Sequence, residues 1–400
     1  MRARHTVIVA AAVALAACTS PAQEARTGAT PSASATTAAT DTPSTSTTPS
    51  ATVDARAACI AKLAAGMSNR ARVGQLLMVG LEPASGAPGV KTAVATYGAG
   101  GVIFLDGWSG AATVKSVASQ VASYASGPAL FVAADQEGGQ VQQLKGAGFS
   151  VIPSAEQQSR LGSAALTTSA TGWAEELRAA GVNVNLAPVA DTVPADIGTA
   201  NGPIGRYHRE YGATPEVVTQ SVTAFIDGMH AGGVAATVKH FPGIGRIAGN
   251  TDTASTGITD NVATVTDPDL APFAAGIAAG ADFVMVSSAN YPKIAEGQAL
   301  FAPAIVTGLL RDRLGYAGVV ITDDVGAAAA VAAVPIGNRA TGFIAAGGDI
   351  VLTARPSDIP IMSKVVLAQA AADPVFADQV AAAVTRVLTL KTARGLTTCS

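Results

Sequence analysis

The sequence predicts an α/β protein built as a single (β/α)8 barrel of the TIM type, preceded by a signal peptide and a flexible, disordered linker. Two observations predict the barrel. From Cys59 on, eight short apolar runs alternate with Ala-rich segments of helical length. Runs that are apolar throughout are buried on both faces, as parallel strands are. Polar residues follow several of these runs, and such a barrel carries its functional groups at the C-terminal ends of its strands.

Each predicted strand is a short run of apolar and β-branched residues, bounded by glycine or by polar residues. No second linker interrupts the alternation after residue 54, which favours one barrel over two domains. Eight strand-helix units also favour a barrel over an open sheet. The predicted strands are residues 74–80, 101–105, 130–134, 182–188, 234–238, 283–286, 319–321 and 350–352.

The N-terminal residues have the pattern of a bacterial signal peptide. Arg2 and Arg4 precede an apolar stretch at 7–15, which is shorter than the roughly 20 residues that a membrane-spanning helix needs. The stretch leads into Leu-Ala-Ala-Cys18, and small residues directly before a cysteine resemble the lipobox of lipoproteins. We therefore expect residues 1–17 to be removed and Cys18 to carry lipid. The alternative is an ordinary secreted protein in which Cys18 occurs by chance.

Residues 18–53 are mostly Ser, Thr, Ala and Pro, with almost no large apolar side chain. Such a segment cannot bury enough surface to offset the entropy of ordering it. We expect this segment to be a flexible tether that precedes a folded body, residues 54–400. If Cys18 carries lipid, the tether holds this body on the outer side of the cell membrane, and otherwise the protein is secreted.

Composition and motifs exclude several functions. The net charge of −3 and the pI near 5.8 do not suit nucleic-acid binding. The four histidines show no paired metal-ligand spacing, and no G-x-S-x-G elbow is present. Residues 243–248 match a dinucleotide fingerprint but lead into a loop instead of opening a helix. We expect a monomer without metal or cofactor.

Once Cys18 is assigned to lipid, Cys59 and Cys399 remain, one at each end of the folded body. Both are expected in an oxidising compartment, so a disulfide between them is predicted to join the two ends of the barrel. The alternative is two free thiols.

Polar side chains converge at the predicted C-terminal rim of the barrel. Lys239 and His240 directly follow the fifth strand, and Pro242 with its flanking glycines then turns the chain over the rim. The third, fourth, sixth and seventh strands also end in polar residues, which are Asp135 to Glu137, Asp191, Ser287 with Ser288, and Thr322 to Asp324.

With these residues the chain resembles glycoside hydrolase family 3, in its single-domain β-N-acetylglucosaminidase branch. The resemblance extends from about residue 60 to about residue 395, in the same order along the chain. The matching pieces are Ala134-Asp-Gln-Glu-Gly-Gly139, Gly181-Val-Asn-Val-Asn-Leu-Ala-Pro188, Lys239-His-Phe-Pro-Gly243 and Gly318-Val-Val-Ile-Thr-Asp-Asp324.

The resemblance implies a retaining mechanism in which Asp323 is the nucleophile and Asp324 a structural neighbour. It also implies that Asp135, Arg209, Lys239 and His240 hydrogen-bond the hydroxyls of the terminal sugar. Charged donors and acceptors suit a polyhydroxylated ligand, whose groups are costly to bury unpaired.

The sequence departs from this branch at two places. The branch carries an Asp-x-His acid/base pair after strand five, and this chain has Asn250 and Asp252 there. Asp252 is then the expected acid/base, with Asn250 donating a hydrogen bond to it. The branch also carries an Arg eight positions after Asp135, where this chain has Gln143, which cannot form the same bidentate contact.

The sequence thus predicts a tethered exo-acting β-glycosidase that releases N-acetylglucosamine-type sugars from cell-wall fragments. Two alternatives stay open. One is a tethered carbohydrate-binding protein that has lost turnover, and the other is a glycoside phosphorylase, whose anionic acceptor depends less on an acid/base residue.

Overall fold

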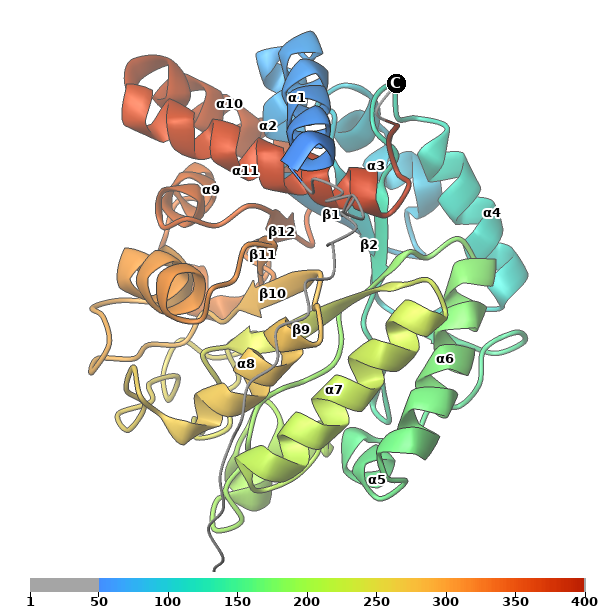
Figure 1. Cartoon of the computed structure of the whole chain (residues 1–400), viewed down its shortest axis with the longest axis vertical. Coiled ribbons are helices and arrows are strands. Elements are labelled where there is room, and N and C mark those ends of the chain that lie inside the picture. Colours follow the sequence, from blue (N-terminus) through green and yellow to red (C-terminus); the bar gives the residue numbers. More distant parts are fainter. Residues whose placement is uncertain (1–49, 399–400) are drawn as a thin grey trace, which may run out of the picture. The chain divides into compact units, whose positions relative to one another are not determined.

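The eight predicted strands form one parallel sheet that curves into a barrel (Figure 1). The computed structural model describes residues 50–398. The strand order is β11-β10-β9-β8-β4-β2-β1-β12, and every neighbouring pair in this order is parallel. The strands are β1 (Leu77–Leu81), β2 (Gly101–Phe104), β4 (Phe131–Ala134), β8 (Val184–Asn185), β9 (Ala235–Phe241), β10 (Phe283–Val286), β11 (Val319–Thr322) and β12 (Val351–Thr353).

Hydrogen bonds between the first and last strands of this order nearly close the barrel. The Thr322 N–H donates to the Ile350 carbonyl at 3.0 Å, and the Ile350 N–H donates to the Val320 carbonyl at 3.0 Å. Ile321 and Ile350 form a parallel bridge between these hydrogen bonds. The predicted (β/α)8 barrel is confirmed.

β8 is shorter than the predicted run 182–188. Side-chain amides take over part of its pairing with β4: Asn183 Oδ1 accepts from the Val132 N–H at 2.9 Å, and Asn185 Oδ1 accepts from the Gln136 N–H at 3.0 Å. Backbone groups next to the short strand are thereby satisfied by side chains.

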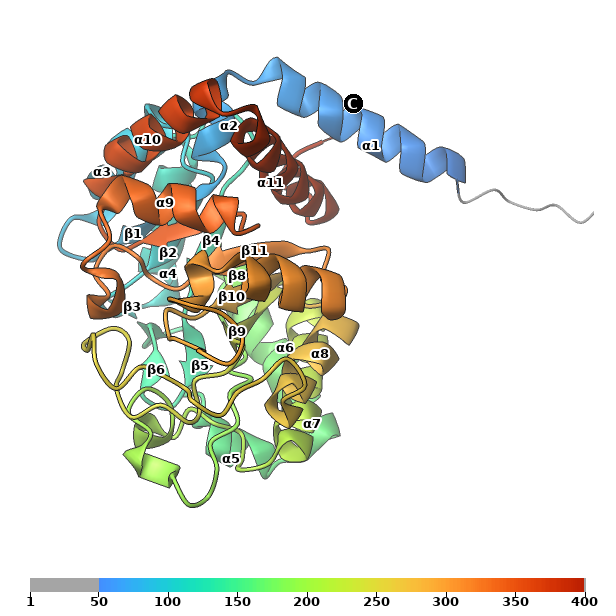
Figure 2. The same cartoon turned by 90° about the vertical axis from the view of Figure 1, so that its left-hand side faces the viewer.

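Helices cover the outside of the barrel (Figures 1 and 2). Their apolar faces recur at the helical period, as Val218, Val222, Phe225 and Met229 of α7 illustrate. The helices are α2 (Asn69–Gly74), α3 (Gly86–Ala95), α4 (Ala111–Ala122), α5 (Ala155–Ser159), α6 (Ser163–Ala179), α7 (Pro215–Ala231), α8 (Ala271–Ala278), α9 (Ile336–Ala345), α10 (Asp358–Ala372) and α11 (Pro374–Ala393), with a π-helix, η5 (Ala304–Arg313), between β10 and β11.

Short elements stand in the loops at the C-terminal rim. An antiparallel pair follows β4 directly, and a parallel pair lies beside it. These pairs are β5 (Gln136–Gly138) with β6 (Val141–Gln142) and β3 (Trp108–Ser109) with β7 (Leu144–Lys145); the 3-10 turns are η1 (Gly198–Ala200), η2 (Gly205–Tyr207), η3 (Pro268–Leu270), η4 (Ala299–Phe301) and η6 (Ala329–Val331).

The N-terminal end of the barrel is filled by a lysine from the last helix. Lys391 of α11 is fully buried, and its Nζ donates to Gln75 Oε1 at 2.7 Å and to the Gly100 carbonyl at 2.8 Å. The same nitrogen lies 5.0 Å from the centre of the Phe131 ring. Since Gln75 and Gly100 precede β1 and β2, these contacts close the end of the barrel opposite the C-terminal rim.

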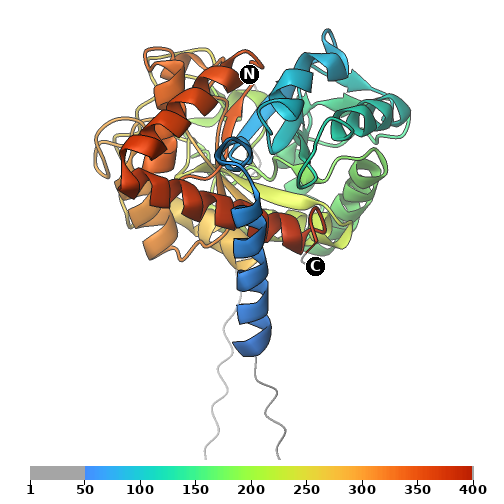
Figure 3. The ribbon, with the colours of Figure 1, turned by 90° about the horizontal axis from the view of Figure 1, so that it is seen from above.

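The first described helix, α1 (Ser50–Gly66), packs on α11 and extends beyond the barrel (Figures 2 and 3). It begins at Ser50, so the predicted end of the linker at residue 53 lies inside a helix. Cys59 on this helix is disulfide-bonded. Its predicted partner Cys399, the predicted lipidation site Cys18, the predicted signal peptide and the linker up to residue 49 lie outside the described residues. No helix within residues 50–398 is long and apolar enough to cross a membrane.

Candidate active site

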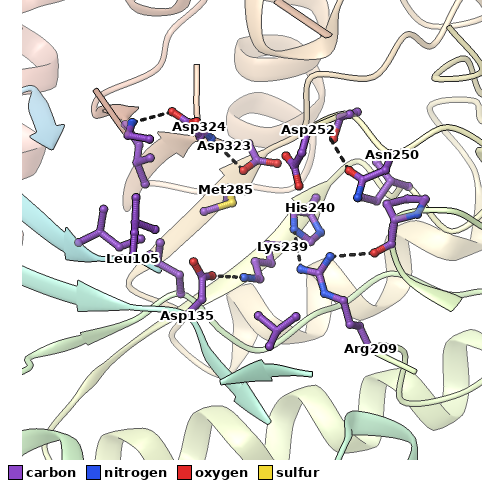
Figure 4. Close-up of a pocket in the computed structure, with 18 of the residues that line it drawn as sticks. Leu105, Asp135, Arg209, Lys239, His240, Asn250, Asp252, Met285, Asp323 and Asp324 are labelled. Carbon is purple, nitrogen blue, oxygen red and sulfur yellow. Dashed lines mark hydrogen bonds and ion pairs between the residues drawn. The ribbon is translucent and has the colours of Figure 1, made fainter. Parts of the chain in front are cut away.

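A cavity of about 290 Å³ lies at the C-terminal ends of the strands (Figure 4). Its apolar walls come from the strands and from residues that follow them, and its polar groups come from strand ends and loops. The polar lining residues are Asp135, Gln143, Arg209, Lys239, His240, Asn250, Thr251, Asp252, Asp323 and Asp324. In the described part of the chain, no group of three or more His, Cys, Asp or Glu side chains is arranged to hold a metal ion.

An irregularity in β9 directs two consecutive side chains into this cavity. Val238 pairs with Val284 and Phe241 with Val286, so β9 has one residue more than β10 between the paired positions. This is a β-bulge at Lys239 and His240. In a regular strand their side chains would point to opposite faces, whereas here both line the cavity.

Lys239 and Arg209 share a buried carboxylate. Lys239 Nζ lies 2.5 Å from Asp135 Oδ1 and 2.6 Å from Glu137 Oε1. Arg209 donates to both oxygens of Glu137, at 2.8 and 2.7 Å. Burial alone would raise the pKa of Glu137, but the charges of Arg209 and Lys239 outweigh it and lower this pKa to about 2. Glu137 therefore stays ionised and fixes both cations at the cavity wall.

His240 is oriented by a carboxylate from the adjacent loop. Asp191 is fully buried, and its Oδ2 lies 2.7 Å from His240 Nδ1. Arg209 Nη2 lies 3.4 Å from His240 Nε2, and a guanidinium can only donate. We infer that His240 carries its proton on Nδ1, donates it to Asp191 and accepts at Nε2. Asp191 also accepts from the Ile244 N–H at 2.8 Å, which fixes the start of the loop after β9.

The two aspartates after β11 differ in their surroundings. Asp324 accepts three backbone N–H groups, from Gly326 at 2.8 Å, Ala327 at 2.9 Å and Ala354 at 2.7 Å. Asp323 Oδ1 accepts the Asp324 N–H at 2.8 Å, and within residues 50–398 no other hydrogen bond reaches this carboxylate. Asp324 is thus occupied by the backbone, while Asp323 is available to a ligand.

Asp252 stands opposite Asp323 on the loop after β9. Asp252 is exposed as a whole residue, but its carboxylate is turned into the cavity toward Asp323, as Figure 4 shows. Burial of the carboxylate and the charge of Asp323 raise the pKa of Asp252 to about 6. Asn250 Oδ1 accepts the Asp252 N–H at 2.9 Å, which is an Asx turn. Among the described residues this amide bonds the backbone of Asp252, and not its carboxylate as the sequence suggested.

A family comparison agrees with this geometry. The sequence profile of the glycosyl hydrolase family 3 N terminal domain matches residues 68–390. The chain belongs to glycoside hydrolase family 3. The match covers all eight barrel strands and every residue that lines the cavity.

Several relatives of this family 3 chain carry related names. A beta-hexosaminidase of Stenotrophomonas maltophilia (strain R551-3) is 35% identical in an alignment 274 residues long, which covers 64% of this chain and 76% of that protein. The crystal structure of a beta-N-acetylhexosaminidase from Beutenbergia cavernae DSM 12333 matches with 45% identity and a TM-score of 0.79, over 83% of this chain and 99% of that one. A glycoside hydrolase family 3 beta-N-acetylglucosaminidase from Paenibacillus sp. str. FPU-7 matches with 28% identity and a TM-score of 0.73, over 83% of this chain and 63% of that one. The predicted resemblance is confirmed, and the chain is a glycoside hydrolase.

The structure brings the predicted site residues of this glycoside hydrolase together. All of them line the cavity described above, although they lie in or after four different barrel strands. They are Asp135, Arg209, Lys239, His240, Asn250, Asp252 and Asp323. Their chemical roles stay predictions.

Two residues with a clear function in the geometry were not assigned one from the sequence. Glu137 joins Lys239 to Arg209, and Asp191 orients His240. Both residues lie in the polar segments that follow strands, and this position is the one feature of the sequence that could have indicated a role in the site. Gln143, at the position where the resemblance led us to expect an arginine, accepts the Gly107 N–H through its Oε1 at 2.9 Å and so joins the rim to the loop after β2.

Proposed function

We propose that this family 3 glycoside hydrolase is a retaining exo-β-glycosidase that releases terminal β-linked N-acetylglucosamine-type sugars from peptidoglycan-derived fragments. The observation that carries the proposal is the pair of carboxylates at Asp252 and Asp323, which face each other over one cavity and differ in environment. The names of the relatives support the sugar class. A cavity of about 290 Å³ is at the small end for ligand sites, which suits a single terminal sugar.

Asp323 is the proposed nucleophile. A carboxylate beneath the anomeric carbon can form a glycosyl-enzyme intermediate, which divides one difficult displacement into two easier ones. The single backbone hydrogen bond to Oδ1 fixes the carboxylate and leaves Oδ2 to attack. The N–H of Asp324 supplies this hydrogen bond, and the carboxylate of Asp324 is held in turn by three backbone donors.

Asp252 is the proposed acid/base. With a pKa near 6, it carries a proton in weakly acidic solution and can give it to the leaving oxygen, then take one from water in the second step. The Asx turn of Asn250 fixes the backbone of Asp252, and this is the role we assign to Asn250 in place of a direct contact with the carboxylate.

The opposite wall is the proposed sugar cradle. Lys239, Arg209 and His240 present donors and an acceptor whose orientation is fixed by Glu137 and Asp191. Asp135 adds a partly exposed carboxylate that can accept from sugar hydroxyls. Such a preorganised set can satisfy each hydroxyl that the cavity removes from water.

The two alternatives differ from this proposal in what happens to bound sugar. A binding protein holds sugar in the same cradle without releasing the aglycone, and a phosphorylase releases it only when phosphate is present. The missing histidine of the branch is the observation that keeps both in consideration.

The deciding test is the release of p-nitrophenol from its N-acetyl-β-glucosaminide by wild type and by Asp252→Ala, with and without azide. The proposal expects turnover by wild type, a slow variant, and recovery of the variant with azide as an external nucleophile. A wild type that binds sugar by calorimetry but never releases p-nitrophenol is a binding protein. Release that requires phosphate identifies a phosphorylase.

We also propose that the protein is tethered outside the cytoplasm through lipid on Cys18, on the basis of the lipobox-like sequence before it. Cells that express wild type should retain it in the membrane fraction, and Cys18→Ala should release it. Equal distribution of both forms contradicts the tether.

A further inference from the structure

The loop that carries Asp252 rests on a second loop, and the contact is made through the backbone. The Ala329 N–H donates to the Asp252 carbonyl and the Ala330 N–H donates to the Thr251 carbonyl, both at 3.0 Å. Thr251 is buried, whereas Asp252 and Thr253 are exposed, so the hydrogen bond from Ala329 is a main contact of the loop at Asp252 itself. The position of Asp252 over the cavity therefore depends on the loop that presents Ala329 and Ala330.

That second loop, residues 325–334, is here called the platform loop, and Arg339 of α9 fixes its shape. The Arg339 side chain is buried at 5% exposure and donates to the carbonyls of Val325 at 2.5 Å, Val334 at 2.7 Å and Ala332 at 3.3 Å. One guanidinium thus holds both ends of the platform loop. The middle, where Ala329 and Ala330 lie in the turn η6, has a further contact of its own.

Gln298 supplies that contact. Its Nε2 donates to the Ala330 carbonyl at 2.6 Å, on the peptide unit next to the one whose N–H holds Thr251. The Gln298 backbone forms an antiparallel bridge with Asn290. Asn290 in turn donates to the Ile258 carbonyl and accepts the Asp260 N–H, both at 2.9 Å. Gln298 therefore connects the platform loop to the returning part of the loop that carries Asp252.

These contacts form a closed ring of hydrogen bonds, here called the circuit, around the acid/base loop, residues 249–257. The Gly249 N–H donates to the Gly257 carbonyl at 2.8 Å and closes the base of the loop, and the platform loop holds its tip. We propose that Gln298 is a positioning residue that keeps Asp252 over Asp323, an inference that rests on the proposed function. It touches neither carboxylate and acts through the peptide units of Ala330 and Ala329.

The variant Gln298→Leu removes the amide donor and keeps the approximate size of the side chain. A matched control is Gln379→Leu, because Gln379 is also half-buried and also donates its amide to an alanine carbonyl, that of Ala345, at 3.1 Å on the outer helices. Two readouts are compared: kcat/KM on aryl β-glycosides with poor and with good leaving groups, and hydrogen exchange at the amides of Ala329 and Ala330.

Loss of one hydrogen bond in the circuit should lower kcat/KM on poor leaving groups by up to about tenfold. The effect on good leaving groups, which need little proton donation, should be much smaller. Exchange at Ala329 and Ala330 should become faster in Gln298→Leu and stay unchanged in Gln379→Leu. Equal losses on all substrates, or the same pattern in the control, overturn the inference in favour of a general effect on the fold.

Asp252→Ala separates failure of the inference from failure of the proposed function. If Asp252→Ala shows the dependence on the leaving group and Gln298→Leu does not, only the inference is wrong. If Asp252→Ala lacks that dependence, the proposed acid/base is wrong. Exchange at Ala330 then decides whether Gln298 holds the loop, and unchanged exchange overturns the inference whatever the activity.

Discussion

The carboxylate of Asp252 faces that of Asp323 across the cavity, and burial together with this neighbouring negative charge raises the pKa of Asp252 to about 6. Two carboxylates in one site resist being ionised together, so the pair favours a state with one proton. A retaining glycosidase needs that state, with an ionised nucleophile and a protonated acid. Because the two carboxylates interact, a change in the charge of Asp323 should appear as a change in the pKa of Asp252.

Replacing Asp323 by Asn should lower the pKa of Asp252, because the variant removes a negative charge and keeps the shape of the side chain. Carboxyl carbon NMR titration of the Asp252 side chain is the measurement. Asp378→Asn, on the exposed side of α11, is the control and should leave the titration of Asp252 where it was. An Asp252 pKa that does not move in Asp323→Asn means that the two carboxylates do not interact in solution.

The activity of wild type should fall as the pH rises through about 6, because the proton on Asp252 is needed at the leaving oxygen. On substrates with poor leaving groups, kcat/KM should decline about tenfold per pH unit above that value. In Asp252→Ala this alkaline limb should disappear, and the rate below pH 6 should be about 10²- to 10⁴-fold lower. A limb that persists in the variant assigns the titration to another group.

The strands and their polar ends could be predicted because both follow from local composition. A run that must be buried on two faces is apolar throughout, and the polar residues after it lie at one rim whatever the details of pairing. The first exception is β8, where the side-chain amides of Asn183 and Asn185 replace backbone pairing. Nothing in a run of apolar residues and asparagines indicates which groups pair.

The finer geometry of the site depends on contacts between segments that are distant in sequence, so it could not be predicted from the sequence. The bulge that turns both Lys239 and His240 inward exists only in the register between β9 and β10. The docking of Asp252 on Ala329 joins segments far apart in sequence. Asn250 was assigned the wrong partner, although an asparagine two residues before a backbone N–H is a typical Asx turn.

Glu137→Gln should destabilise the fold by about 3 kcal/mol at pH 7, because it leaves Lys239 and Arg209 without their shared buried anion. The folded-state pKa of Glu137, about 2, lies below the ordinary value of 4.5 for this group. Its stabilisation is therefore complete above pH 4.5 and is lost as the pH falls toward 2. Urea unfolding of both proteins at pH 7 and pH 3 should show a smaller difference at pH 3.

A surface carboxylate provides the control for Glu137. Glu156 pairs with Arg160 at 2.5 Å, but its side chain is 38% exposed. Glu156→Gln should change the free energy of unfolding by no more than about 0.5 kcal/mol. A difference between wild type and Glu137→Gln that does not depend on pH would show that shape, and not charge, accounts for the loss.

The lysine at the opposite end of the barrel should give the reverse pH dependence. Burial lowers the pKa of Lys391 to about 7, against an ordinary value of 10.5. Between these values the unfolded chain binds more protons than the folded one, so the free energy of unfolding rises with pH. The neutral amine keeps two hydrogens, enough for its bonds to Gln75 and Gly100, so the contact persists while the penalty of burying a charge is removed. Relative to Lys391→Met, wild type should therefore gain up to about 1.4 kcal/mol in its free energy of unfolding per pH unit between pH 7.5 and 9.5, as measured by urea unfolding.

Lys364→Met, at an exposed position on α10, is the control, and its free energy of unfolding should depend on pH as that of wild type does over the same range. If Lys391→Met runs parallel too, the ring of Phe131 and the two acceptors keep the ammonium charged in the folded barrel.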